Sequence, residues 1–301
     1  MLEINKDQHI YSFSKDNDAV AYCDSKTTVV FNTSDCYGDM VKTVDYDWDK
    51  FLIRVNPSTG PLYINQAEQG DTLIVKIINI ELNPTGIIVS KPNNGVFGME
   101  VKDRVTKIVG IINNQVEFND QIKFDVKPMI GCIGCAPIAG DIPSSTPNNH
   151  GGNLDNRKIT IGSILELPVF VDGALLAMGD LHAAMGDGEV NCSGIECGGR
   201  VTVEVEVLKN RRLTNPRVIT DGILYTMASG IDLDMASGIA CKEMLNVLME
   251  YNHMDIYDAG MLMSAIGNLE VCQIVNPLAS ARFGVDLKYI NYDIKDGKNG
   301  N

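Results

Sequence analysis

Hydrophobic and polar residues alternate along much of the first two thirds of the chain, in short runs separated by Gly, Pro and Asn. The clearest run is RVTVEVEVL at 200–208, where valine at every second position predicts a strand with one face in the core. LIVKIINIEL at 73–82 is apolar on both faces, which favours a strand buried in a sandwich or barrel. TTVVFNT at 27–33 predicts another strand, and together these runs indicate an all-β unit.

Turn signals divide the strands. Asn113-Asn114 predicts a hairpin turn between strands near 104–112 and 115–124. Asp172-Gly173 lies between LPVFV and ALLAM and predicts a second hairpin. Residues 128–155 show no clear periodicity, and their Ile, Met and Cys argue against disorder, so we expect an ordered functional loop there.

Helical periodicity appears only in the last third of the chain. The first predicted helix, capped by Asp232 or Asp234, ends near Tyr251, and the second covers about 255–266. We therefore expect a mainly β protein with a β-sandwich, a second β-barrel-like part and a small C-terminal α+β unit. The expected parts are an N-terminal β-sandwich at 1–130, a central β part with the acidic, glycine-rich site at 131–213, and the α+β part at 214–301.

The segment GDLHAAMGDGEVNCSGIE at 179–196 concentrates acids among glycines. Asp180 and His182 are two residues apart, as are Asp187 and Glu189, and extended backbone directs such pairs to one side. Glycines let a segment fold tightly around an ion or substrate. Mixed His and carboxylate ligands suit zinc or another transition metal, whereas carboxylates alone suit calcium or magnesium. Taken alone, any one of these carboxylates could instead belong to a solvated acidic loop, and His182 could be a structural, hydrogen-bonded histidine.

A second polar cluster, HGGNLD, lies in the long loop and contains His150, Asn153 and Asp155. Asn153 and Asp155 are equally good turn formers, because Asx side chains bond their own backbone. Asp35 and Cys36 directly follow the TTVVFNT strand, where a loop can present them to a site, although Cys36 also suits the core.

Eight cysteines raise a competing interpretation. Cys132 and Cys135 have the spacing of a zinc knuckle, and with Cys192 and Cys197 they would form a four-thiolate zinc site. Their apolar neighbours favour buried free thiols instead. The first residues show no basic and apolar leader pattern, so we expect reduced thiols and a cytoplasmic setting.

Charge and missing motifs exclude several functions. The 301 residues carry a net charge of −14, from 39 acidic and 25 basic side chains, which argues against nucleic acid or an anionic membrane as the main partner. GxGxxG after a strand and the P-loop lysine motif are both missing, so we expect no nucleotide cofactor. No GxSxG elbow occurs, and Ser144-Ser145 lacks a glycine-rich flank, which disfavours covalent serine catalysis.

One long motif, GDLHAAMGDGEV, is preceded by HGGNLD and followed by GIE. GDTLIVKIINI, IGCIGCAP and SAIGNLEVCQIVNP accompany it in a fixed order along nearly the whole chain. In this combination the chain resembles the acetamidase/formamidase family. The resemblance implies hydrolysis of short aliphatic amides to a carboxylate and ammonia, a β-rich fold with a small C-terminal α+β part, and assembly as a homodimer or homotetramer.

The resemblance also implies a site, carried over by motif. The HGGNxD element corresponds to His150, Asn153 and Asp155, the GDxHAAxGDGE element to Asp180, His182, Asp187 and Glu189, and an acidic position after the first strand to Asp35. The chain departs from the family pattern at Gly267-Asn268, where Gly-Asp is usual, and at Asn191-Cys192-Ser193, where Cys-Gly-Thr is commoner.

Amides are poor electrophiles, so hydrolysis needs an activated water and a stabilised oxyanion, and a divalent metal supplies both. We expect zinc, with calcium as the alternative, held among Asp35, Asp155, Asp180, His182 and Asp187. The catalytic residues are expected to be Glu189, which moves protons, with His182, and with His150 or Asn153 near the oxyanion. Two alternatives remain open: hydrolysis of another non-peptide C–N bond, and a non-catalytic metal- or ligand-binding β-protein.

Overall fold

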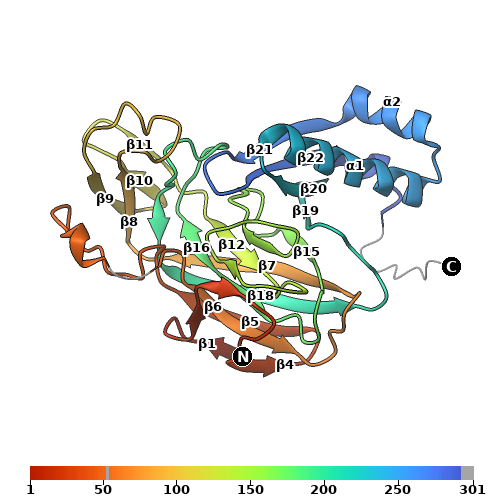
Figure 1. The fold of residues 1–301 in the computed structure, drawn as a ribbon, viewed down its shortest axis with the longest axis horizontal. Coiled ribbons are helices and arrows are strands. Elements are labelled where there is room, and N and C mark those ends of the chain that lie inside the picture. Colours follow the sequence, from red (N-terminus) through yellow and green to blue (C-terminus); the bar gives the residue numbers. More distant parts are fainter. Residues whose placement is uncertain (52–53, 293–301) are drawn as a thin grey trace.

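The computed structural model describes residues 1–51 and 54–292. Over these residues the chain forms two large sheets and a pair of helices near its C-terminal end (Figure 1). Strands account for 41% of the residues and helices for 13%, which confirms the predicted mainly β class. Within the described ranges, no helix combines the length and the apolar character needed to cross a membrane.

In the described part of the chain, the first sheet has nine strands. Only β1 and β5 pair in parallel, and the other neighbours are antiparallel. Its order is β1 (Leu2–Ile4), β5 (Thr27–Thr33), β18 (Gly199–Leu208), β7 (Thr72–Leu82), β15 (Ile164–Pro168), β19 (Arg217–Thr220), β20 (Ile223–Gly230), β22 (Ala279–Asp286) and β21 (Asn268–Gln273). The strands predicted near 27–33, 73–82 and 200–208 are thus confirmed, and they are neighbours in this sheet.

The second sheet has eleven strands among the described residues. Its main path is β11 (Lys123–Asp125), β10 (Gln115–Glu117), β9 (Val105–Ile112), β8 (Thr85–Ser90), β17 (Glu196–Cys197), β16 (Leu176–His182), β12 (Met129–Gly134) and β14 (Gly151–Asn153). Off this path, β6 (Ser58–Ile64) pairs with β16, β2 (His9–Ile10) and β4 (Ala21–Cys23). The short strands β3 (Ser12–Phe13) and β13 (Ile142–Pro143) form a separate pair.

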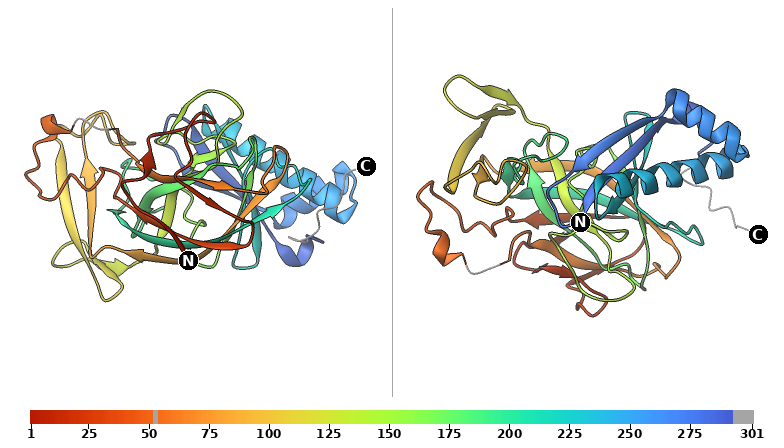
Figure 2. Two further views of the ribbon diagram at one scale, coloured as in Figure 1. Left: turned by 90° about the horizontal axis from the view of Figure 1, so that it is seen from below. Right: turned by 45° about the horizontal axis from the view of Figure 1, so that its top comes forward.

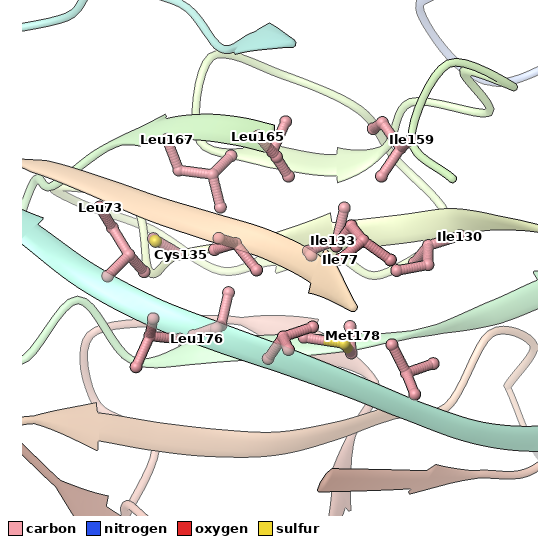
Figure 3. Packing of buried hydrophobic residues seen from close by; sticks show 14 of the residues in the cluster. Leu73, Ile77, Ile130, Ile133, Cys135, Ile159, Leu165, Leu167, Leu176 and Met178 are labelled. Atoms are coloured by element: carbon pink, nitrogen blue, oxygen red, sulfur yellow. The ribbon is translucent and has the colours of Figure 1, made fainter. Parts of the chain in front are cut away.

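The main core lies between the two sheets. Figure 3 shows Leu73 and Ile77 from β7 of the first sheet packed with Ile133 from β12 and Met178 from β16 of the second. All four side chains are buried, and each such residue contributes roughly 1.5–3 kcal/mol on burial. Two sheets that share one apolar layer form a sandwich, as predicted.

Two features of this architecture differ from expectation. The second sheet is open, not barrel-like. The nine-stranded sheet takes strands from all three expected parts, 1–130, 131–213 and 214–301, so the boundaries near 130 and 213 do not separate the sheets.

One predicted hairpin is confirmed and the other is wrong. Residues Asn113 and Asn114, with φ of 49° and 61°, connect the antiparallel strands β9 and β10. The segments flanking Asp172-Gly173 instead belong to different sheets, because β15 pairs with β7 and β19 while β16 pairs with β6, β12 and β17. Both segments are apolar on both faces, so each can be buried as an interior strand of its own sheet. The connection at Asp172-Gly173 therefore crosses from one sheet to the other.

The passage at 128–155 is not a loop. It contains the fully buried strand β12, which pairs with β16 and β14 in the second sheet, and the short strands β13 and β14 follow it. The glycines of β12 interrupt its apolar pattern, so hydrophobic periodicity did not predict the strand. They are needed because neighbouring backbone approaches closely: a Cβ on Gly134 would lie 2.7 Å from the backbone nitrogen of Gly152.

Both helices are confirmed. The helix α1 (Leu233–Asn252) is capped by Asp232, and α2 (Ile256–Ile266) by Asp255. They cover one face of the β20–β22 region, as the second view in Figure 2 shows, and share a second core with it. Two short 3₁₀ helices, η1 (Trp48–Lys50) and η2 (Leu287–Tyr289), complete the described elements. The helical layer supports β21 and β22, whose connecting loop reaches the site described next.

Candidate active site

The end of strand β16 carries two buried polar side chains, Asp180 and His182. The antiparallel partner β17 places Glu196 opposite His182 in register. His182 Nε2 lies 3.1 Å from Glu196 Oε2 and 3.9 Å from Glu189 Oε1. The structure therefore gathers a histidine and three acids around the end of β16, and Asp155 joins them from the chain after β14. These five residues are called the acid–histidine cluster below.

Two asparagines orient the acids of the cluster. Asn276 Nδ2 donates to Asp155 Oδ2 at 2.6 Å, and Asn56 Nδ2 donates to Asp180 Oδ2 at 2.9 Å. The same two amide groups also hold Asn153, through its backbone oxygen at 3.1 Å and its Oδ1 at 3.1 Å. Each of these two acids is therefore held by a side-chain amide donor, and the two donors come from different loops.

Three acids of the cluster adopt left-handed backbone: Asp155 at φ 43°, Asp180 at 57° and Glu189 at 45°. This region costs on the order of 1–3 kcal/mol for residues other than glycine, and it persists where the surroundings over-determine the conformation. Glycines provide the remaining space. A Cβ on Gly194 would lie 2.4 Å from His182 Cδ2, and one on Gly131 would lie 2.5 Å from Asp155 Oδ1.

The cluster has the donor chemistry of a divalent cation site. Cys36, Asp180 and Glu196 form one group, and Asp155, His182 and Glu189 form another, each with ligand atoms within 4.8 Å of one another. Several of these buried atoms have no hydrogen-bond partner among the described residues: both ring nitrogens of His182, Asp155 Oδ1 and Glu196 Oε2. The 3.1 Å contact between His182 and Glu196 is close enough for an ion pair but lacks hydrogen-bond geometry. Unsatisfied buried nitrogen and oxygen atoms that converge in this way fit a cation.

Burial and mutual charge perturb these groups strongly. Burial raises the pKa of Glu189 well above its usual value, and the charges of Asp155 and Glu196 raise it further. Burial alone would lower the pKa of His182, but Glu196 and the other acids outweigh it and raise the value to about 10. Burial likewise opposes ionisation of Glu196, yet the charge of His182 keeps its pKa below the usual value. His182 and Glu196 thus form an ion pair, while burial and the neighbouring acids raise the pKa of both Glu189 and Asp180 well above its usual value.

A cavity of about 390 Å³ opens above the cluster. Its walls come from the second sheet, from the loop after β5 and from the β21–β22 loop. The lining residues are Cys36, Tyr37, Trp48, Phe51, Val55, Asn56, Val89, Lys91, Asn94, Arg104, Ser145, Asn153, Asp180, Glu189, Cys192, Glu196, Val275, Asn276 and Pro277. Cluster acids therefore form the floor of a cavity that a small molecule can occupy.

Three of the predicted site residues lie elsewhere. Asp35 is buried, but its Oδ1 accepts hydrogen bonds from the backbone nitrogens of Tyr37 and Asp39, which makes it a turn residue. The Asp187 carboxylate forms ion pairs with two arginines, Arg282 at 2.7 Å and Arg157 at 3.0 Å.

His150 is the third of these residues. Its ring is buried against Phe13 at 5.0 Å, and burial lowers its pKa to about 4. It does not line the cavity.

Three residues of the site were not selected from the sequence, and a fourth, Cys36, was considered there with the core as its alternative place. Glu196 belongs to the 179–196 segment, and its position opposite His182 required knowledge of strand pairing. Cys36 follows Asp35, and the choice between these neighbours depends on which side chain faces inward. Asn56 and Asn276 carried no signal beyond their place in turn-rich segments.

The alternative four-cysteine site is not assembled. Of the groups of potential metal ligands found in the described residues, neither contains Cys132, Cys135, Cys192 or Cys197. All four are free thiols, and the Cys132 Sγ lies 3.1 Å from the backbone oxygen of Ser144.

Comparisons with known proteins agree on one family. The family model described as "Acetamidase/Formamidase family" matches residues 3–146 and 139–276. A crystal structure of an acetamidase from Bacillus halodurans is 40% identical, with a TM-score of 0.92, over 96% of this chain and 98% of that one. A predicted acetamidase/formamidase from Thermoanaerobacter tengcongensis is 38% identical, with a TM-score of 0.93, over 97% and 99%.

Curated relatives match over shorter segments. The formamidase of Methylophilus methylotrophus is 28% identical over 176 residues, 51% of this chain and 43% of its own length. The chain spans no more than 61% of the length of the curated relatives it matches.

Proposed function

Because the chain belongs to the acetamidase/formamidase family, we propose that it hydrolyses short linear amides to a carboxylate and ammonia. Membership confirms the predicted enzyme class at the level of the family. The observation that supports the reaction in this chain is the acid–histidine cluster, which holds unsatisfied buried nitrogen and oxygen atoms and lines a cavity with Asp180, Glu189 and Glu196.

We assign a divalent cation to His182, Asp155 and Glu196, the side chains of the cluster with unpartnered ligand atoms. The cation would replace the proton of the His182–Glu196 ion pair, because only the neutral imidazole coordinates a metal. One nitrogen and two carboxylates suit zinc better than calcium. When bound, such a cation lowers the pKa of water and polarises the amide carbonyl. Asp35 and Asp187 have no part in this assignment, because their carboxylates are already committed to a turn and to two arginines.

Glu189 is the proposed proton carrier. It borders the cavity, and its negative neighbours make its carboxylate a strong base once it is ionised. As the water oxygen bonds to the amide carbon, Glu189 accepts the water proton. As the C–N bond breaks, it returns that proton to the leaving nitrogen, which departs as ammonia. Asn153 uses its Oδ1 to accept from Asn56, which leaves its Nδ2 as a donor for the oxyanion.

Ammonia release from formamide and acetamide, with metal content measured on the same preparation, tests the proposal. Glu189→Gln removes the base without changing size, and we expect kcat to fall about 10²–10⁴-fold. His182→Ala should lower both metal content and activity. Glu100→Gln is the matched control, because Glu100 is exposed and does not line the cavity. Undiminished activity in a metal-free preparation would contradict the metal assignment, and undiminished activity of Glu189→Gln would contradict the proton carrier.

A further inference from the structure

The cavity is larger than the smallest amides require. A volume of about 390 Å³ has room for about a dozen water molecules at ~30 Å³ each. Acetamide, with its single methyl group, would fill a small part of that space. The rest of the cavity lies between the acids on the floor and the residues at the mouth, and those residues indicate which kind of tail would occupy it.

Two cations face the cavity at the mouth, Lys91 and Arg104. Neither forms an ion pair with an acid in the described part of the chain. The acids that line the cavity are Asp180, Glu189 and Glu196, and all three belong to the floor. In a chain of net charge −14, these two cations without an ion pair offer positive charge to an anionic group in the cavity.

The arginine side chain stacks on an aromatic ring. Its guanidinium carbon lies 4.7 Å from the ring centroid of Trp48, whose Nε1 donates to Thr106 Oγ1 at 3.2 Å. Trp48 is itself packed edge-on against Tyr37 at 5.3 Å. A guanidinium stacked on a ring keeps its N–H groups at its edge, in the fork geometry that binds a carboxylate through two hydrogen bonds.

We propose that the preferred substrates of this cavity are half-amides of short dicarboxylic acids, with the primary amide at the floor and the free carboxylate at Arg104 and Lys91. The proposal rests on the amide hydrolysis proposed above and names its substrate class. Hydrolysis of such a compound releases ammonia and a dicarboxylate, whose second negative charge forms beside the floor acids and favours departure of the product.

Succinamate and succinamide are the matched probes, because they have the same chain length and differ in the charge of the tail. We expect kcat/KM to be at least about 5-fold higher for succinamate at low salt and the difference to shrink as ionic strength rises. In Arg104→Gln and Lys91→Gln, the ratio of kcat/KM on succinamate to that on acetamide should fall at least about 3-fold each. Lys102→Gln removes the same charge from an exposed side chain that does not line the cavity, and it should leave the ratio unchanged.

The outcomes separate this inference from the proposed function. Turnover of acetamide with no preference for succinamate, or a ratio unaffected by both cavity variants, overturns the substrate class and leaves amide hydrolysis standing. If the wild type releases no ammonia from any of these amides, amide hydrolysis fails, and calorimetric binding of succinamate decides the subsite. Binding that Arg104→Gln weakens and Lys102→Gln does not would support it, whereas no binding, or equal binding by both variants, would overturn it.

Discussion

Gly131 lies on β12 beneath two acids of the cluster, and replacing it with alanine gives a sharp test of the proposed site. The added Cβ would lie 2.5 Å from Asp155 Oδ1, 2.7 Å from the backbone oxygen of Asp180 and 2.8 Å from its Oδ2. An ordinary contact begins at 3.4 Å, so the Asp155 oxygen must move from 2.5 to 3.4 Å, close to 1 Å. Displacement on this scale costs on the order of 10²-fold in rate, and overpacking of a buried site costs about 1–3 kcal/mol of stability.

The assay combines kcat/KM on acetamide, metal content and the free energy of unfolding for Gly131→Ala. Gly284→Ala is the steric control: its Cβ would lie 2.5 Å from the Tyr225 ring in the first sheet, outside the cavity lining. Both variants should lose stability. Only Gly131→Ala should also lose metal and kcat/KM by more than its loss of stability explains. A Gly131→Ala enzyme with wild-type metal content and kcat/KM would refute the assignment of these carboxylates to the reaction.

Two further results follow from the buried charges. Asp155, Asp180 and Glu189 have folded pKa values above their unfolded ones, so the stability they contribute is complete below about pH 4 and is lost as pH rises through the folded values. The Tm of the metal-free protein should therefore fall from pH 5 to pH 8, and added zinc should raise it most at the higher pH; a flat or rising profile without metal would contradict this. Arg282 is fully buried and pairs with Asp187 and Glu270, so Arg282→Met should cost about 3–5 kcal/mol in urea unfolding. Arg200→Met, which removes partly exposed pairs at 3.8 Å, should cost less than about 1 kcal/mol, and equal losses would contradict the burial argument.

The sequence predicts where the strands of this fold lie along the chain better than it predicts which strands pair with each other. Strand β18 was recognisable because valines alternate with polar residues, a pattern that depends on one strand and one core face. The apolar segments around Asp172-Gly173 predict a hairpin equally well, yet they join different sheets. Local turn chemistry cannot distinguish these outcomes when both strands are buried on both faces. Strand β12 was missed for a related reason, because its glycines serve the close approach of β14 and of the cluster acids.

The same limit explains which site residues were found. Asp180, His182 and Glu189 share one segment with dense glycines, so local sequence singles them out. Glu196 belongs to that segment too, but only the pairing of β17 with β16 distinguishes it from a surface acid.

Asn276 comes from the last layer of the fold, and its 2.6 Å hydrogen bond to Asp155 joins residues 121 positions apart. It reaches Asp155 because the β21–β22 loop is fixed by Gln273, whose Oε1 accepts from the backbone nitrogens of Val275 and Asn276 at 2.8 Å each. The C-terminal α+β layer is therefore part of the site, because it supplies the amide that orients an acid of the cluster and one wall of the cavity above it.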